Sequence, residues 1–309
     1  MNVVKDCFRS VKYDCLKFIK KQETKNQKFK NKEKMIGSFI VPLSIWIANK
    51  KNKKNTLIIG LAGGQGTGKT TITSLISIIL KKYFKMNVFI ASIDDFYKSR
   101  KDRVKLSKKK HPLLLTRGVP GTHDIELVLN FFKNLKKRKF KSVKLPKFDK
   151  SIDDRAPKSK WYNVNTRPDV VILEGWCVAA EKQSTKDILK PINSLEKKED
   201  KSHIWRRYVN TQLKTKYNTL NKYLDEKIYL KTPSFNMLKQ WRIKQEEKLR
   251  LKFKKTKNSK VMTVPEVLRF MMFYQRVTLQ MFKSMPKSSS VVLVLNKFHQ
   301  ITNIIFNKK

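Results

Sequence analysis

The chain has 309 residues, of which 40% are hydrophobic and 31% charged, so it can bury a large core and lacks the composition of a disordered chain. Its longest apolar run, Met35–Ala48, contains Pro42 and is too short to span a membrane, and the N-terminus has no signal-peptide layout. The cysteines Cys7, Cys15 and Cys177 favour neither a disulfide framework nor a zinc cluster, so we expect a cytoplasmic protein without a membrane partner.

The net charge of +47 raises the question of a nucleic-acid partner. The excess consists almost entirely of lysine, with 58 lysines and only 13 arginines. Proteins that read nucleic acids usually draw on arginine as well, because its planar fork fits phosphates and base edges. We therefore expect a background of solvated lysines and no specific nucleic-acid partner. The sequence does not fix the oligomeric state.

In chain order, residues 1–34 are predicted to form a charged helical arm ahead of one domain over residues 35–309. That domain begins with Ile36–Ala48, a predicted helix packed on the core. Residues 184–202 are polar and contain Pro191, which is typical of an insertion. Apolar runs predict five strands, at Thr56–Ala62, Asn87–Ile93, Asp169–Glu174, Asp225–Leu230 and Val291–Leu295.

A glycine-rich segment follows the first predicted strand and precedes an apolar helix over 72–80. It matches the phosphate-binding loop G-x-x-x-x-G-K-[ST] in its proper context. Glycines let successive N–H groups point at phosphate oxygens, and the helix N-terminus adds its positive end. Lys69 should reach the β- and γ-phosphates, and the Thr70 hydroxyl should ligate Mg²⁺. The predicted nucleotide-binding residues of the loop are Gly63, Gly64, Gln65, Gly66, Thr67, Gly68, Lys69, Thr70 and Thr71.

Acidic residues stand where two further strands end. Asp94 and Asp95 follow the strand over 87–93, and Glu174 ends the strand over 169–174. Ligands of an open parallel sheet bind beyond the carboxyl ends of its strands, so these carboxylates should face the phosphate site. They could supply a base for an acceptor hydroxyl and a ligand near Mg²⁺. The alternative for Asp94 or Asp95 is a helix N-cap.

Residues 233–260 are predicted to form a lid over the triphosphate. Pro233–Phe253 has the pattern of a helix with proline at its start, and a basic loop, Lys252–Lys260, follows. Arg242 of this helix would contact phosphate when the lid closes and excludes water. The alternative is a solvated amphipathic helix. Asn296-Lys297 resembles the guanine-specifying N-K-x-D motif, but the fourth residue is His299, so guanine specificity is unsupported.

Several motifs in order carry a family resemblance: GGQGTGKTT, SIDDFY, TRGVPGTHD, PKFDKSIDDRAP, VILEGWCVA and the later PSF–WR–QE–LR–MT. They resemble the P-loop kinases related to uridine kinase, pantothenate kinase and phosphoribulokinase, and more closely the D-glycerate 3-kinase group. The resemblance implies an α/β three-layer sandwich of the P-loop NTPase type, with a mainly parallel five-stranded sheet and a helical lid. It also implies that Asp94 is the catalytic base, that Lys69 is catalytic, and that Glu174 lies near the metal and phosphates.

Such a kinase needs residues that hold an acceptor carrying a carboxylate and hydroxyls. Arg117 or Arg155 could clamp the carboxylate in a bidentate manner. His123 and Asp124 would lie near the hydroxyls. For each arginine the alternative is a salt bridge that braces a loop, and for His123 it is a structural role. The predicted acceptor-binding residues are Asp95, Tyr97, Arg117, His123, Asp124 and Arg155.

The sequence thus predicts a cytoplasmic, Mg²⁺- and ATP-dependent small-molecule kinase, with D-glycerate as the leading acceptor. One alternative is a kinase for another hydroxylated metabolite, such as a nucleoside, pantothenate or a sugar. The other is a nucleic-acid-stimulated P-loop ATPase. Against the latter, Glu174 lies in Leu-Glu-Gly instead of the Asp-Glu of helicase-type ATPases.

Overall fold

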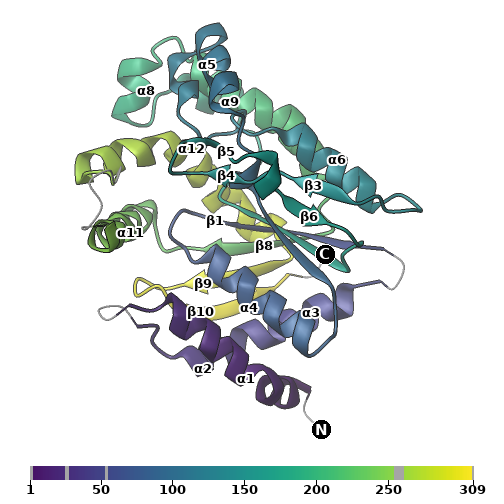
Figure 1. The fold of residues 1–309 in the computed structure, drawn as a ribbon. Helices are drawn as coiled ribbons and strands as arrows, with labels where there is room; N and C mark the ends of the chain where they lie inside the picture. Colours follow the sequence, from purple (N-terminus) through teal and green to yellow (C-terminus); the bar gives the residue numbers. More distant parts are fainter. Residues whose placement is uncertain (1–2, 25–27, 53–54, 254–260, 308–309) are drawn as a thin grey trace.

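A six-stranded sheet in the order β10-β9-β8-β1-β7-β2 forms the centre of the molecule (Figure 1). The computed structural model describes residues 3–24, 28–52, 55–253 and 261–307. Neighbouring strands of the sheet are parallel except β10, which pairs antiparallel with β9. The strands of this sheet are β1 Leu57–Gly63, β2 Val88–Ser92, β7 Val170–Gly175, β8 Glu226–Lys231, β9 Val291–Leu295 and β10 Ile301–Phe306. Two small antiparallel sheets pair β3 (Val143–Leu145) with β6 (Tyr162–Val164), and β4 (Phe148–Asp149) with β5 (Asp154–Arg155).

The five predicted strands are confirmed, and β10 is an addition that the sequence analysis did not predict. A tight turn joins β9 to β10, in which Asn296 Oδ1 accepts hydrogen bonds from the backbone N–H groups of Phe298 and Gln300. His299 adopts a left-handed conformation in this turn, with φ of 66°. The segment that resembles a nucleotide-specificity motif is therefore a hairpin turn, in which the Asn296 side chain is bonded to the turn itself.

The helices and helical turns are α1 Val3–Gln22, α2 Lys32–Met35, η1 Ile36–Ile40, α3 Val41–Lys50, α4 Lys69–Lys82, η2 Ile93–Phe96, α5 Arg100–Lys109, η3 Pro112–Leu115, α6 Ile125–Leu135, η4 Lys158–Lys160, α7 Thr185–Leu189, α8 Ser194–Glu199, α9 Ile204–Gln212, η5 Leu213–Tyr217, α10 Asn218–Asn221, α11 Phe235–Phe253 and α12 Val264–Ser288. None of the helices in the described ranges combines the length and the apolar character needed to cross a membrane.

The two faces of the sheet carry separate hydrophobic cores, because alternate residues of a strand point to opposite faces. On one face, Ile59 and Leu61 of β1 are buried together with α1, α3 and α4 (Figure 1). On the other face, Ile58 and Ala62 are buried together with α6, α9 and α12. The molecule is therefore the predicted three-layer α/β sandwich. Both faces of β1 are covered, which explains its uninterrupted apolar sequence.

The predicted N-terminal arm contains α1, which packs against α4 (Figure 1). Its buried face consists of Cys7, Val11, Cys15 and Ile19, which recur at helical spacing, and most of its lysines are exposed. These side chains belong to the same core as β1 and α4. In the structure this segment therefore forms part of one core layer.

The predicted insertion over 184–202 contains α7 and α8, and its charged groups are not all solvated. Glu196 is fully buried and forms an ion pair with Arg276 of α12, at 2.7 Å. The Asp200 carboxylate is also fully buried, and its oxygens accept the backbone N–H groups of Trp205 and Arg206 at the start of α9. The polar composition of this segment thus serves a buried network that docks it on two helices.

Candidate active site

The phosphate-binding loop has the predicted arrangement between β1 and α4. Gly66 and Gly68 adopt left-handed conformations, with φ of 75° and 84°, which glycine reaches without steric cost. The Thr67 hydroxyl donates a hydrogen bond to the Gly64 carbonyl at 2.8 Å, which closes the loop. Residues over 63–71 therefore form a preshaped cradle at the carboxyl end of the central strand.

Lys69 lies at the first position of α4, with its side chain folded onto the loop. Its ammonium donates hydrogen bonds to the carbonyls of Gly63 and Gly64, each at 2.9 Å. Burial lowers the pKa of Lys69, and the nearby carboxylates of Glu174 and Asp94 oppose that shift. A partly buried ammonium whose partners are neutral carbonyls is positioned to exchange them for phosphate oxygens.

Thr70 and Glu174, the two residues predicted to ligate Mg²⁺, lie next to each other. The Thr70 hydroxyl donates a hydrogen bond to Glu174 Oε1 at 2.9 Å, while Oε2 is buried without a hydrogen-bond partner among the described residues. Burial raises the pKa of Glu174, and Lys69 opposes this. An orphaned buried carboxylate oxygen beside a hydroxyl fits Mg²⁺, which binds one or two protein oxygens together with substrate phosphates. The described part of the chain has no cluster of three His, Cys, Asp or Glu residues of the kind that holds a metal alone.

Asp94 follows β2 and faces the phosphate site. It accepts hydrogen bonds from the Tyr97 hydroxyl and from the Lys150 ammonium, each at 2.8 Å. Burial acts to raise the pKa of Asp94, but the charge and hydrogen bond of Lys150 outweigh it and hold the pKa at about 2. Asp94 is therefore ionised at neutral pH. It makes no helix-capping hydrogen bond, so the capping alternative does not account for it.

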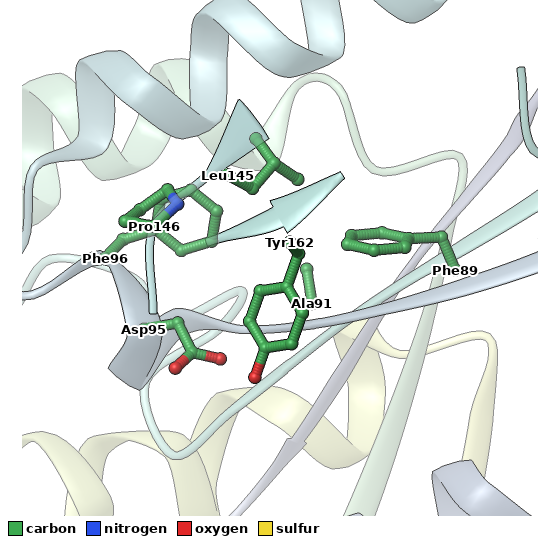
Figure 2. Close-up of a pocket in the computed structure, with 7 residues that line it drawn as sticks. All are labelled: Phe89, Ala91, Asp95, Phe96, Leu145, Pro146 and Tyr162. Carbon is green, nitrogen blue, oxygen red and sulfur yellow. The ribbon is translucent and has the colours of Figure 1, made fainter. Parts of the chain in front are cut away.

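Asp95 points elsewhere, although it is adjacent in sequence. Its carboxylate accepts the backbone N–H of Phe148 at 3.1 Å. Figure 2 shows it beside Tyr162 in a small pocket lined mostly by apolar side chains such as Phe89 and Leu145. Burial raises the pKa of Asp95. The structure thus gives it a bracing contact to the start of β4 and separates it from the carboxylate of its neighbour.

Tyr97 and His123, two of the predicted acceptor-binding residues, lie side by side. Their rings stack with centroids 4.5 Å apart, and their backbones form an isolated β-bridge. His123 Nδ1 lies 2.6 Å from the Tyr217 hydroxyl, while Nε2 is buried without a hydrogen-bond partner among the described residues. Burial lowers the pKa of His123 to about 4, so its ring is neutral at pH 7. A neutral imidazole with a free nitrogen can exchange a hydrogen bond with a hydroxyl group.

Both candidate carboxylate-binding arginines have acidic partners in this structure. Arg155 donates to Asp124 Oδ2 at 2.9 Å and to the Tyr97 carbonyl at 2.8 Å. Arg117 forms an ion pair with Asp153. These contacts correspond to the loop-bracing alternative. They also hold both guanidinium groups at the β4–β5 hairpin, which contains Asp153 and Arg155 and contacts Asp95 just beyond β2.

The sequence analysis missed Arg103, which lies on α5 and joins that helix to the β4–β5 hairpin and to the loop before Arg117. Its side chain is buried and donates to the carbonyls of Leu115 and Asp153, at 2.7 and 2.5 Å. It thereby ties α5 to the loop that carries Arg117. The signal was present, since an arginine retained in a lysine-rich stretch suggests that its planar fork is needed. Lys150 was also missed, because one lysine among 58 has no distinguishing pattern.

The predicted lid helix α11 contacts the phosphate-binding loop directly. A Cβ atom at Gly64 would lie 2.5 Å from the Leu238 side chain. Trp241 stacks on His299 of the β9–β10 turn, with ring centroids 4.2 Å apart. Arg242 forms an ion pair with Glu246 one turn along the helix, so in this structure it contacts its own helix. The part of the predicted lid over 254–260 lies outside the described residues.

Gly118 provides a test of how tightly the loop over 116–122 is packed. It has φ of 133°, and a Cβ atom there would lie 1.9 Å from the Tyr274 hydroxyl oxygen. We expect Gly118→Ala to lower the free energy of unfolding by at least about 2 kcal/mol, from backbone strain and overpacking together. Chemical denaturation measures it. Gly37→Ala is the control, because its Cβ would make only an ordinary 3.5 Å contact with Phe8; an equal loss in both variants would contradict the packing argument.

The fold and the site together define a phosphotransferase of the P-loop class. The Phosphoribulokinase / Uridine kinase family description matches residues 58–194. The "Uncharacterized kinase mug58" of Schizosaccharomyces pombe is 30% identical over 232 residues, which cover 72% of this chain and 80% of that protein. The chloroplastic D-glycerate 3-kinase of Arabidopsis thaliana is 29% identical over 231 residues, 69% of this chain but only 48% of that protein.

A solved structure gives the same fold. The D-glycerate 3-kinase from Cryptococcus neoformans var. grubii superposes with a TM-score of 0.70 at 24% identity, covering 87% of this chain and 97% of that one. The chain belongs to the phosphoribulokinase/uridine kinase family of P-loop kinases.

Proposed function

We propose that this kinase transfers the γ-phosphoryl group of ATP to a hydroxyl of a small metabolite, and that the metabolite is D-glycerate, which becomes 3-phosphoglycerate. The observation that carries the proposal is the placement of Asp94. Its ionised carboxylate follows β2, next to the strand that carries Glu174 at the phosphate site, and it accepts the hydroxyl of Tyr97, whose ring stacks on His123. A base in that position connects a phosphoryl donor to an alcohol acceptor.

In the proposed reaction, the acceptor hydroxyl oxygen attacks the γ-phosphorus. The bond between that phosphorus and the β–γ bridging oxygen breaks, ADP leaves, and the hydroxyl proton passes to Asp94. Lys69 exchanges its loop carbonyls for phosphate oxygens and stabilises the charge that develops there. The backbone N–H groups of the loop orient the phosphates.

Thr70 and Glu174 are the residues that would hold Mg²⁺, since their oxygens are adjacent and Glu174 Oε2 has no described partner. Mg²⁺ bound with the nucleotide would neutralise charge on the β- and γ-phosphate oxygens. We assign Asp94 to the acceptor and not to the metal. Its two oxygens already accept the Tyr97 hydroxyl and the Lys150 ammonium, whereas Glu174 has an oxygen without a described partner.

The acceptor side of the site supports a hydroxy acid. Arg117 and Arg155 supply two guanidinium groups, held by Asp153 and Asp124, that could bind a carboxylate by exchange of partners. The free Nε2 of His123 could bind a hydroxyl. The Arabidopsis relative named as a D-glycerate 3-kinase points to the same acceptor. We place the reaction in the cytoplasm, where the three free, buried cysteines would stay reduced.

A panel of acceptors tests the assignment. Purified protein is incubated with ATP, Mg²⁺ and D-glycerate, L-glycerate, uridine, pantothenate or fructose, and products are identified by mass spectrometry. We expect phosphoryl transfer to D-glycerate to exceed transfer to every other acceptor. Transfer to another member of the panel would keep the kinase and replace the acceptor. The Lys69→Ala variant identifies any background from a contaminating kinase.

The nucleic-acid-stimulated ATPase is tested separately. We expect duplex DNA or RNA to leave ATP turnover unchanged, and to bind only weakly, with affinity that falls about 10³-fold between 50 and 200 mM salt if several phosphates are contacted. Acceptor-dependent turnover should persist at 200 mM salt, because the site is partly buried and screening there is weaker. Strong stimulation by nucleic acid and none by any acceptor would favour the ATPase.

A further inference from the structure

Lys150 lies on the β4–β5 hairpin and reaches the base of the proposed reaction. Its ammonium is 2.8 Å from Asp94 Oδ2, while its side chain is 62% exposed. Both ends of the hairpin are anchored, because Phe148 N–H donates to Asp95 and the Arg155 guanidinium donates to the Tyr97 carbonyl. The backbone at Lys150 is therefore fixed relative to the site, while its exposed side chain can change partners.

Lys150 reaches the end of the sheet where the phosphate-binding loop lies. Its partner Asp94 follows β2, and Ser92, the last residue of β2, pairs with Glu174 of β7. Glu174 in turn accepts the hydroxyl of Thr70, the residue after Lys69. The ammonium therefore lies at the same end of the sheet as the phosphate-binding lysine and the candidate metal ligand.

The contact with Asp94 is well suited to be temporary. Because the Lys150 side chain is 62% exposed, its ammonium can leave Asp94 without becoming a buried, unpaired charge. A γ-phosphate offers more negative charge and more acceptor oxygens than one carboxylate. Transfer of the ammonium to the phosphate would also leave Asp94 Oδ2 free for the acceptor hydroxyl.

We propose that Lys150 is a catalytic phosphate ligand, which is held on Asp94 in the free enzyme and moves to the γ-phosphoryl group when ATP binds. This role rests on the proposed phosphotransfer at this site, but not on the identity of the acceptor. Lys69 then holds the phosphates from the loop side, and Lys150 holds the transferred group from the hairpin side. Binding of ATP thus also frees the Asp94 carboxylate from Lys150, so that it can act as the base.

Discrimination between ATP and ADP tests the role, because only ATP carries the γ-phosphate. Calorimetric titration with the β,γ-imido analogue of ATP and with ADP, each with Mg²⁺, is compared for the wild type and Lys150→Met. We expect the Kd of the ATP analogue to rise about tenfold and that of ADP to change less than about twofold. Lys150→Arg should recover much of the preference, since it keeps the charge. With the best acceptor of the panel, Lys150→Met should lower kcat about 10- to 100-fold.

Lys158→Met is the matched control, because Lys158 is an exposed lysine further along the same segment and the charge change is identical. It should leave both affinities and kcat unchanged. Equal weakening of ATP and ADP by Lys150→Met, or an unchanged ratio with unchanged or raised kcat, would overturn the proposal and leave Lys150 as a latch on Asp94. The binding measurement uses no acceptor, so a wrong acceptor assignment appears in the panel and not here.

Discussion

Asp94→Asn is expected to lower kcat by about 10²–10⁴-fold while leaving the KM for ATP within a small factor of the wild-type value. The amide keeps the size of the side chain and can still accept the Tyr97 hydroxyl, but it cannot take the proton of the acceptor. The pKa of Asp94, held at about 2 by Lys150 against the effect of burial, keeps the wild-type carboxylate ionised throughout the neutral range. Steady-state kinetics with the best acceptor of the panel measure the loss.

Asp95→Asn is the matched comparison, since it makes the same chemical change one residue away. Its oxygen accepts the Phe148 backbone N–H, and an asparagine oxygen can do the same. We expect a much smaller effect on kcat than for Asp94→Asn. If Asp95→Asn is instead the inactive variant, the base is Asp95 and the mechanism proposed above has the wrong residue.

The comparison of these two residues shows how far sequence reasoning reaches. A strand followed by two acidic residues predicts carboxylates at the edge of the sheet, and that edge is where both are found. The strand pattern alone does not say which one turns toward the loop, and only the family resemblance favoured Asp94. That choice depends on the short helical turn η2 and on the hairpin packed beside it, which brings Phe148 to Asp95 and Lys150 to Asp94.

The central strands and the phosphate-binding loop were predictable for a related reason. Their signals are local: an apolar run buried on both faces, then glycines where the backbone must turn. The edge strand β10 was not predicted from the sequence, because it depends on the turn over 296–300 that pairs it with β9. The roles of Arg103 and Lys150 were not predicted, because their partners come from distant segments of the chain. In a lysine-rich sequence, moreover, a single lysine gives no distinct signal.

For the arginines, the sequence left two roles open and did not say which groups they contact in the free enzyme. Arg117 and Arg155 were candidates to bind a substrate carboxylate or to brace loops, and in the structure each pairs with an aspartate. The two alternatives are compatible, because a guanidinium held by Asp153 or Asp124 is already desolvated in part and oriented. Binding of a carboxylate would then require a change of partner and little movement of the loop.

Lys69→Ala is expected to lower kcat by at least about 100-fold, because it removes a charged contact to the transferring phosphoryl group that operates in a buried site. The fold should persist, since only two hydrogen bonds are lost, to the carbonyls of Gly63 and Gly64, and alanine is a good residue for the first turn of α4. Circular dichroism and thermal denaturation check the fold, and single-turnover kinetics with ATP and acceptor measure the chemical step. Lys81→Ala is the control, an exposed lysine on the same helix, and it should retain full activity. Activity near the wild-type value in a folded Lys69→Ala protein would contradict the assignment of this loop as the phosphate site.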